Sequence, residues 1–329
     1  MRERLNWLDS MRGLAFLMVI YYHLSTRSAG GIVPYFTPVF LTAFFFVSGY
    51  LAKSGMPFGK VLEQRTRTLF VPLLIFGLGG GIVLAKMNQG MVMDGIVEVF
   101  KGVFYQYGKH QTLWFIASLY VYSLMFYWVD NFCRTPIRLA IGCVLLIIMG
   151  QLLQYVLGCP RLPYKLESSL WAMAIMGIGK LYKLYEREVD AKIMKWQFAA
   201  VSLVLYIVLI YSFEANVLYD GHPNWFLAIS IPMTGLHWML YLSKYVIVDM
   251  KSLLFIGSNS LVYFAIHRQV LNAVEATTKK IMASLSIEPS LWSNLLEMAV
   301  IAIIIVVPVW IINKYIPQVT GKGWKLWNA

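Results

Sequence analysis

The segment from Asp9 to His23 combines ionisable side chains with an apolar stretch long enough to cross a membrane. Its sequence, LDSMRGLAFLMVIYYHLS over residues 8–25, contains Asp9, Arg12 and His23. A charged side chain at the centre of a bilayer costs about 3 kcal/mol or more, so such residues face a protein interior or a water-filled cavity. We therefore interpret these three side chains as candidate site residues.

Arg12 and His23 share one face of the predicted helix. They are eleven residues apart, which places them within about 20° of each other around the axis and about 16 Å apart along it. Asp9 lies one turn before Arg12, at a spacing that allows a local ion pair. Two other interpretations remain open: Asp9 and Arg12 could form an interfacial anchor, and His23 could be an interhelical hydrogen-bond partner.

Arg65 and Arg67 directly precede the apolar stretch that begins at residue 68. Guanidinium groups bind phosphate and carboxylate bidentately. The pair is therefore predicted to hold the phosphates of a cytoplasmic cofactor, such as a coenzyme A thioester. Simple charge anchoring at the membrane surface is the alternative interpretation.

Polar or aromatic side chains in three apolar segments are supporting candidates. Ser260 and His267 are seven residues apart and so share a helix face. Each candidate also has an ordinary packing explanation, because small and polar residues commonly mediate helix contacts in membranes. The four residues are Ser48, Trp114, Ser260 and His267.

The composition places these residues in a membrane protein. The chain is 59% hydrophobic and 13% charged, whereas soluble domains carry roughly 25% charged residues. Stretches of about 20 apolar residues predict membrane-spanning helices, so we expect an all-α integral membrane protein with a bundle of about ten transmembrane helices. The predicted spans are 7–26, 35–52, 68–86, 112–129, 138–157, 168–183, 196–213, 225–243, 253–272 and 291–313.

Lysine and arginine are distributed unevenly among the predicted loops. A cytoplasmic N-terminus puts roughly eighteen basic residues inside and about eight outside, as the positive-inside rule requires. Both termini are therefore predicted to be cytoplasmic. The same rule accounts for the net charge of +12, so nucleic-acid binding is not expected.

The predicted spans follow one another without a linker or a long hydrophilic tail. We expect a single transmembrane domain over residues 1–329 with no fused soluble domain. The outer segment 87–111 is expected to hold a short interfacial helix. The three cysteines lack CxxC spacing and histidines at ligand spacing, so neither a disulfide framework nor a metal site is predicted.

The candidate motifs occur together in one order along the chain. These are D-x-x-R-G with a histidine eleven residues after the arginine, FFFVSGY, paired arginines before a proline-containing helix, LWF, and NSL-x-Y-x-x-H. The set resembles acyltransferase family 3, integral membrane O-acyltransferases that modify bacterial surface carbohydrates. The resemblance extends over essentially the whole chain. It implies a bundle of about ten helices and a multi-pass protein of the bacterial cytoplasmic (inner) membrane.

The resemblance implies acyl transfer from cytoplasmic acyl-CoA, most often acetyl-CoA, to a hydroxyl of an extracytoplasmic surface carbohydrate. The partners would be acyl-CoA, a surface glycan or lipid-linked saccharide acceptor, and membrane lipid. His23 would be the essential catalytic residue, and Arg12 would belong with it. The family's donor-site pattern is R-x-x-R, whereas this chain has Arg65-Thr66-Arg67, so the part played by each arginine stays open.

The implied chemistry leaves several roles to be assigned. His23 could be a general base on the acceptor hydroxyl or a transient acyl carrier. Arg12 could neutralise a phosphate or a developing oxyanion. Asp9 is about 20 Å from His23 along the helix, so a group that orients His23 must come from another helix. The alternative function is a transporter or flippase of glycan precursors, against which the lack of internal repeats and of matching broken helices argues.

Overall fold

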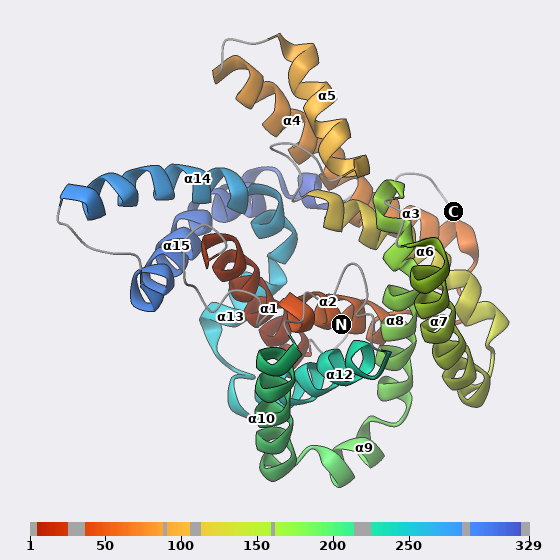
Figure 1. The fold of residues 1–329 in the computed structure, drawn as a ribbon. Coiled ribbons are helices and arrows are strands. Elements are labelled where there is room, and N and C mark those ends of the chain that lie inside the picture. Colours follow the sequence, from red (N-terminus) through yellow and green to blue (C-terminus); the bar gives the residue numbers. More distant parts are fainter. Residues whose placement is uncertain are drawn as a thin grey trace. The chain divides into compact units, whose positions relative to one another are not determined.

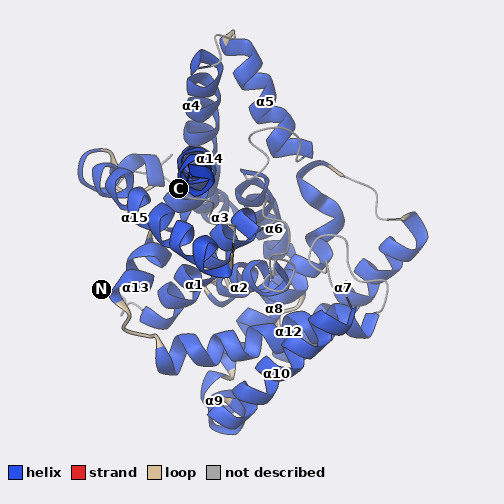
Figure 2. Cartoon of the chain, turned by 60° about the vertical axis from the view of Figure 1, so that its left-hand side comes forward, coloured by secondary structure: helices blue, strands red, loops and turns tan. Residues whose placement is uncertain are grey.

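The chain is helical wherever the structure describes it. The computed structural model describes residues 5–25, 37–87, 91–105, 113–158, 162–213, 225–284 and 290–323, and these segments contain no strand (Figure 1, Figure 2). The helices are α1 (Asn6–Ser25), α2 (Thr37–Tyr50), α3 (Phe58–Arg65), η2 (Thr66–Phe70), α4 (Val71–Met87), α5 (Val92–Tyr105), α6 (Trp114–Phe132), α7 (Pro136–Leu157), η4 (Pro163–Ser168), α8 (Ser169–Leu184), α9 (Glu186–Ile193), α10 (Trp196–Phe213), α12 (Trp225–Tyr241), η5 (Leu242–Val246), α13 (Lys251–Ser258), α14 (Ser260–Ser284), α15 (Leu291–Tyr315) and η6 (Pro317–Thr320).

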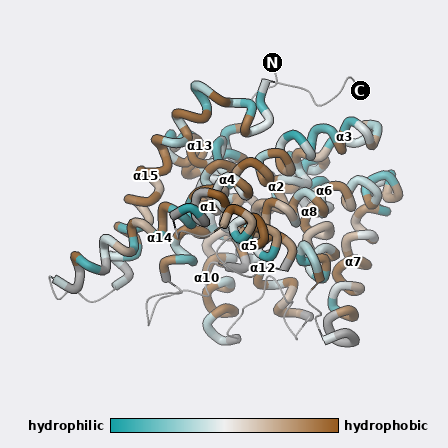
Figure 3. The backbone as a smooth tube through the Cα atoms, turned by 90° about the horizontal axis from the view of Figure 1, so that it is seen from above, coloured by the Kyte–Doolittle hydropathy of each residue, from teal (hydrophilic) through white to brown (hydrophobic). Residues whose placement is uncertain are grey.

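Several helices are suited to a membrane. Each of the ten predicted spans contains a helix. Among the described residues, three stretches are long and apolar enough to cross a bilayer, namely Pro136–Leu153, Phe226–Val246 and Trp292–Tyr315, and Figure 3 shows the hydrophobic character of α7 and α15. Helices α9 and α10 pass the same test together but are bent by 81°. The protein is thus a helical membrane protein, while ten spans and cytoplasmic termini stay predictions.

The ninth predicted span, 253–272, is divided into two helices. Asn259 separates α13 from α14 with φ −115° and ψ 15°. Its side-chain amide donates a hydrogen bond of 2.8 Å to the carbonyl of Phe255. This side-chain contact with the backbone ends α13, in the way that asparagine commonly competes with helix continuation. Helix α14 then runs to Ser284, well beyond the predicted end.

The described residues form two compact units. The first unit comprises Met1–Val47, Tyr182–Tyr263 and His267–Val307. The second comprises Ser48–Leu181, Phe264–Ile266 and Pro308–Ala329.

In the first unit, α1 packs closely against α13 through glycines on both helices. A Cβ added to Gly13 would lie 2.3 Å from the carbonyl oxygen of Leu253. The hydroxyl of Ser10 donates to the carbonyl of Ile247 at 3.0 Å. Small residues allow two helix backbones to approach in this way, and the contact holds the helix that carries Arg12 and His23.

In the second unit, α2 packs against α8 at the SGY motif. A Cβ on Gly49 would lie 1.8 Å from the carbonyl oxygen of Met176, so only glycine fits there. Nearby, Lys180 of α8 forms a buried ion pair with Asp130 of α6 and donates to the hydroxyl of Ser54 at 2.6 Å. Ser48, the neighbour of Gly49 in α2, is half-buried.

Helix α5 lies within the segment 87–111, which was predicted to lie outside the membrane and to hold a short helix. It packs on α4, where a Cβ on Gly81 would lie 2.7 Å from the carbonyl of Gly95. Met93, Val97 and Phe100 are exposed and share one face of α5 by their spacing. An exposed apolar face of this kind is typical of a helix at a membrane surface.

Candidate active site

His23 on α1 lies against the first half of α14 in the first unit. Its ring lies beside that of His267, with centroids 5.4 Å apart and planes inclined by 31°. The Nη1 atom of Arg268 lies 3.5 Å from Nδ1 of His23. His23 and Arg268 are half-buried, and His267 is fully buried. The structure therefore brings the predicted site residues His23 and His267 together and places the guanidinium of Arg268 beside His23.

Arg268 was not selected from the sequence, although a signal for it exists. It lies within the ninth predicted span, and an ionisable residue in a membrane helix is a functional candidate by default. The contact with His23 joins residues 245 positions apart, a separation at which helical periodicity gives no information.

His267 is held by contacts within α14 and with α1. Its Nδ1 lies 3.2 Å from the carbonyl oxygen of Tyr263; since a carbonyl only accepts, this nitrogen carries the hydrogen. Phe16 of α1 packs edge-on against the His267 ring with centroids 5.4 Å apart. Ser260, the half-buried first residue of α14, lies about two turns before His267 on the same face.

Arg12 and Asp9 form the ion pair that their spacing allowed. Nη2 of Arg12 lies 2.8 Å from Oδ1 of Asp9, and the Asp9 side chain is buried. Because α1 is one continuous helix, Arg12 is about 16 Å from His23 along its axis. Both roles considered for Arg12, neutralising a donor phosphate and stabilising an oxyanion, stay predictions.

Ser48 and Arg65 line one cavity in the second unit. The cavity has a volume of about 40 Å³, and Lys53, Gln64 and Asp130 also line it. It has room for a few water molecules. Burial lowers the pKa of the Arg65 guanidinium, because removing a charge from water disfavours the charged form. Two predicted residues from different helices thus share one cavity, whose lining is partly polar and partly apolar.

Arg67 has different surroundings from Arg65. It lies in the π-helical turn η2, directly after the end of α3, and outside the set of residues that line the cavity. A Cβ on Gly321, which has φ +76°, would lie 2.4 Å from the carbonyl oxygen of Arg67. The segment around Gly321 therefore covers the Arg67 backbone. Single π-helical turns often occur at functional sites, and this one separates the two arginines that were predicted as a pair.

Trp114 at the start of α6 lies against Lys165, a buried lysine whose backbone conformation is strained. Nζ of Lys165 lies 5.6 Å from the Trp114 ring centroid, and Lys165 is buried. Tyr164 and Lys165 have φ of 57° and 56°, a left-handed conformation that non-glycine residues keep only when their surroundings enforce it. Hydroxyls of Ser118 and Tyr122 enforce it by donating to the Tyr164 and Lys165 carbonyls, respectively. No local sequence signal predicts this arrangement.

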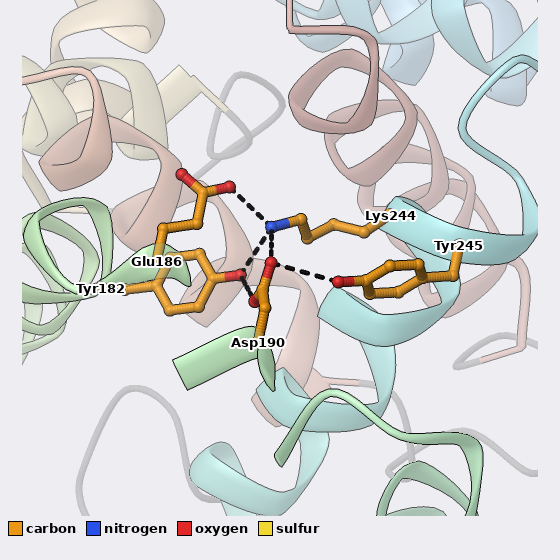
Figure 4. Close-up of polar contacts among 5 residues, drawn as sticks. All are labelled: Tyr182, Glu186, Asp190, Lys244 and Tyr245. Atoms are coloured by element: carbon orange, nitrogen blue, oxygen red, sulfur yellow. Dashed lines mark hydrogen bonds and ion pairs between the residues drawn. The ribbon is translucent and has the colours of Figure 1, made fainter. Parts of the chain in front are cut away.

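Lys244 forms a second polar cluster in the first unit, shown in Figure 4. Its Nζ lies 2.6 Å from a carboxylate oxygen of Glu186 and 2.5 Å from one of Asp190. Tyr182 and Tyr245 donate to Asp190 at 2.5 Å and 3.1 Å. The cluster joins α8, α9 and η5. It was not predicted, although Glu186 and Asp190 share a helix face by their i, i+4 spacing.

The same ammonium also contacts the beginning of α1. Nζ of Lys244 lies 5.1 Å from the centroid of the Trp7 ring, within the range of a cation–π interaction. The cluster is therefore a support for α1, the helix that carries Arg12 and His23.

His237 is engaged at both ring nitrogens. Its Nε2 lies 3.1 Å from the carbonyl oxygen of Ile193, and its Nδ1 lies 2.6 Å from the hydroxyl of Ser202. The carbonyl must accept from Nε2, so Nδ1 accepts from the Ser202 hydroxyl. These bonds connect α9, α10 and α12, as polar side chains commonly do in membrane bundles. His237 serves as a structural reference for tests of His23.

Within the described segments, no group of three or more His, Cys, Asp or Glu side chains is placed to hold a metal ion.

The fold and the imidazole–guanidinium contact between α1 and α14 define a helical membrane protein with a polar site among its helices. Residues 5–314 match the family model described as acyltransferase domain. The chain therefore belongs to acyltransferase family 3 and is an acyltransferase, which confirms the resemblance found in its motifs. No curated protein and no solved structure matches the chain.

Proposed function

We propose that this acyltransferase moves a short acyl group, acetyl in the first instance, from cytoplasmic acyl-CoA to a hydroxyl of an extracytoplasmic surface carbohydrate. The observation that carries the proposal is the half-buried His23 imidazole beside the Arg268 guanidinium and the His267 ring. Imidazole is the side chain best suited to exchange a proton near neutral pH. The acceptor would be a surface glycan or a lipid-linked saccharide, and the protein would span the bacterial cytoplasmic (inner) membrane several times.

Arg65 is the residue best suited to bind the donor. It lines the cavity in the second unit, and Asp130, which also lines that cavity, is paired with Lys180. A desolvated guanidinium gains from a phosphate that compensates its charge. Acyl-CoA is much larger than a few water molecules, so its binding requires the cavity to open. Arg67 would contribute further charge for the donor phosphates. In the first unit, Arg12 is the cation that would serve the donor.

In the proposed reaction, His23 accepts the proton of the acceptor hydroxyl as the oxygen attacks the thioester carbonyl carbon. The carbon–sulfur bond then breaks. The leaving thiolate receives the proton from the imidazolium, which yields an ester and free CoA thiol. The cationic Arg268 beside His23 is suited to stabilise the oxyanion formed between the two steps.

A second route makes His23 the nucleophile. Its nitrogen would attack the thioester, release CoA and carry the acyl group until the acceptor hydroxyl displaces it. The two routes differ in kinetics. An acyl-histidine intermediate releases one equivalent of CoA before acceptor is added, whereas general-base catalysis releases CoA only with acceptor or water.

The proposal is tested by the acyl content of surface glycans in cells whose sole source of the activity is this protein. His23→Gln should abolish acylation, while the protein remains in the membrane in normal amounts. His237→Gln, which removes an imidazole from a structural contact, is the matched control and should retain acylation. Full acyl content with His23→Gln would overturn the catalytic role of His23. A transporter or flippase is not supported by the family to which the chain belongs.

A further inference from the structure

The contact between Arg268 and His23 determines which lone pair of the imidazole is available. A guanidinium has donors only, so it can bond only to a ring nitrogen that carries a lone pair. The 3.5 Å contact, at the long end of the hydrogen-bond range, is a hydrogen bond only when Nδ1 of His23 is the acceptor. In the neutral ring the hydrogen then lies on Nε2. Neither nitrogen of such a ring offers an unoccupied lone pair to a substrate.

The neighbouring ring contacts hold this arrangement in place. The His267 ring lies beside His23, and His267 is itself fixed through Nδ1 to the Tyr263 carbonyl. Tyr22 packs edge-on against the His23 ring, with ring centroids 5.3 Å apart. Rotation of the His23 ring would disturb these contacts.

We propose that Arg268 is a positioning residue that caps the lone pair of His23 in the substrate-free protein, and that the acceptor hydroxyl displaces it. The inference rests on the proposed function, in which His23 takes a proton from that hydroxyl. A lone pair accepts one strong hydrogen bond at a time, so the guanidinium and the hydroxyl compete for it. The orienting group that could not be identified on α1 is thus a cation on α14.

The cap has a consequence for side reactions. Without an acceptor, water could use the same base to hydrolyse the donor, turning acyl-CoA and water into a carboxylic acid and CoA thiol. A capped lone pair cannot activate that water. Once displaced, the guanidinium remains beside the reacting carbonyl and can donate to its oxyanion. Arg268 therefore suppresses hydrolysis before the acceptor binds and assists transfer afterwards.

The first test measures chemically whether the lone pair of His23 is available, and it does not require acyltransferase activity. Diethyl pyrocarbonate acylates neutral imidazole nitrogens, and mass spectrometry resolves each histidine. At about pH 8, where imidazole is ordinarily neutral, His23 should react about tenfold faster in Arg268→Met than in the wild type, since a bond from a charged donor is lost. Arg268→Lys, which keeps a cationic donor, should stay near the wild-type rate. His237 in the same sample corrects for reagent and detergent.

Equal His23 reactivity in the wild type and Arg268→Met would overturn the proposal. Should the methionine variant not fold, two measurements replace it. Arg268→Gln, a neutral and weaker donor, should give an intermediate rate. Nitrogen-15 spectra of histidine-labelled wild-type protein should show Nδ1 of His23 as the unprotonated nitrogen, and the opposite tautomer would equally overturn the cap.

The second test follows CoA release from acetyl-CoA without acceptor. Arg268→Met should raise acceptor-independent hydrolysis several-fold while lowering transfer to acceptor, and Arg268→Lys should restore both toward the wild type. If His23 reactivity changes as expected but no variant cleaves acetyl-CoA, the proposed function fails and the cap stands. If acetyl-CoA is cleaved but neither its hydrolysis nor the reactivity of His23 changes in the Arg268 variants, the proposed function stands and the cap fails.

Discussion

The carbonyl oxygen of Asp9 occupies the space that a side chain on Gly257 would need. A Cβ on Gly257 would lie only 1.8 Å from that oxygen. Helix α1 can therefore lie this close to α13 only with glycine at position 257. The same turn of α1 carries the Asp9 carboxylate that pairs with Arg12, so this backbone contact places one end of the candidate site.

We expect Gly257→Ala to destabilise the protein by about 2 kcal/mol or more, because the added carbon overpacks a backbone contact that cannot relax locally. Thermal unfolding in detergent measures the effect. Gly79→Ala is the matched control, since nothing lies within 4 Å of a Cβ at Gly79; it should be neutral or stabilising by up to about 1 kcal/mol. Equal stability of the two variants would contradict the close contact of α1 and α13.

The Asp9–Arg12 pair should behave as a coupled unit. Arg12→Gln leaves the buried Asp9 carboxylate without its cation and should cost about 3 kcal/mol. The double variant Asp9→Asn with Arg12→Gln should recover part of that loss, with a coupling energy of about 1–3 kcal/mol. A double-mutant cycle measured by chemical unfolding gives this coupling. Additive effects would show that the two side chains do not interact energetically.

Lys244→Met should destabilise the protein by about 3–5 kcal/mol, because it leaves the Glu186 and Asp190 carboxylates without their cation. Lys101→Met is the control: Lys101 is 57% exposed and 3.5 Å from Glu98, and exposed pairs contribute little. Melting temperatures of the two variants provide the comparison. A loss of stability in Lys101→Met as large as in Lys244→Met would argue against a structural role for the cluster.

Arg65→Ala should weaken acetyl-CoA binding about tenfold to hundredfold, the contribution of a hydrogen bond to a charged group. Arg67→Ala should have a smaller effect, because Arg67 lies outside the cavity that Arg65 lines. Arg65→Lys should be intermediate, since it keeps the charge but not the bidentate fork. Calorimetric titration of acetyl-CoA measures all three. Unchanged binding in the double Arg65→Ala, Arg67→Ala variant would remove both residues from the donor site.

Features that depend on neighbours along one helix were predictable from the sequence. Apolar length predicted a helix over residues 7–26, and i, i+3 spacing predicted the Asp9–Arg12 ion pair. The structure has α1 over Asn6–Ser25 and the ion pair within it. The motif order also identified the family, which is confirmed over residues 5–314. These predictions succeeded because helical geometry depends on local sequence.

Features that join distant segments were not predictable in the same way. Arg65 and Arg67 were predicted together as a donor-binding pair with their separate parts left open, and the π-helical turn Thr66–Phe70 gives them different surroundings. The ninth span was predicted as one helix, but Asn259 divides it. In both places a local deviation of the backbone changes which side chains share a face, and periodicity assumes that no such deviation occurs.

The sequence by itself determined a helical membrane protein of the acyltransferase family with His23 and Arg12 on one helix face. Only the tertiary structure decided what surrounds them: Arg268 and His267 beside His23, and Gly257 and Lys244 supporting the beginning of α1. The physical reason is that spacing within a helix is set by backbone geometry. Which helix lies opposite depends on close packing between segments hundreds of residues apart.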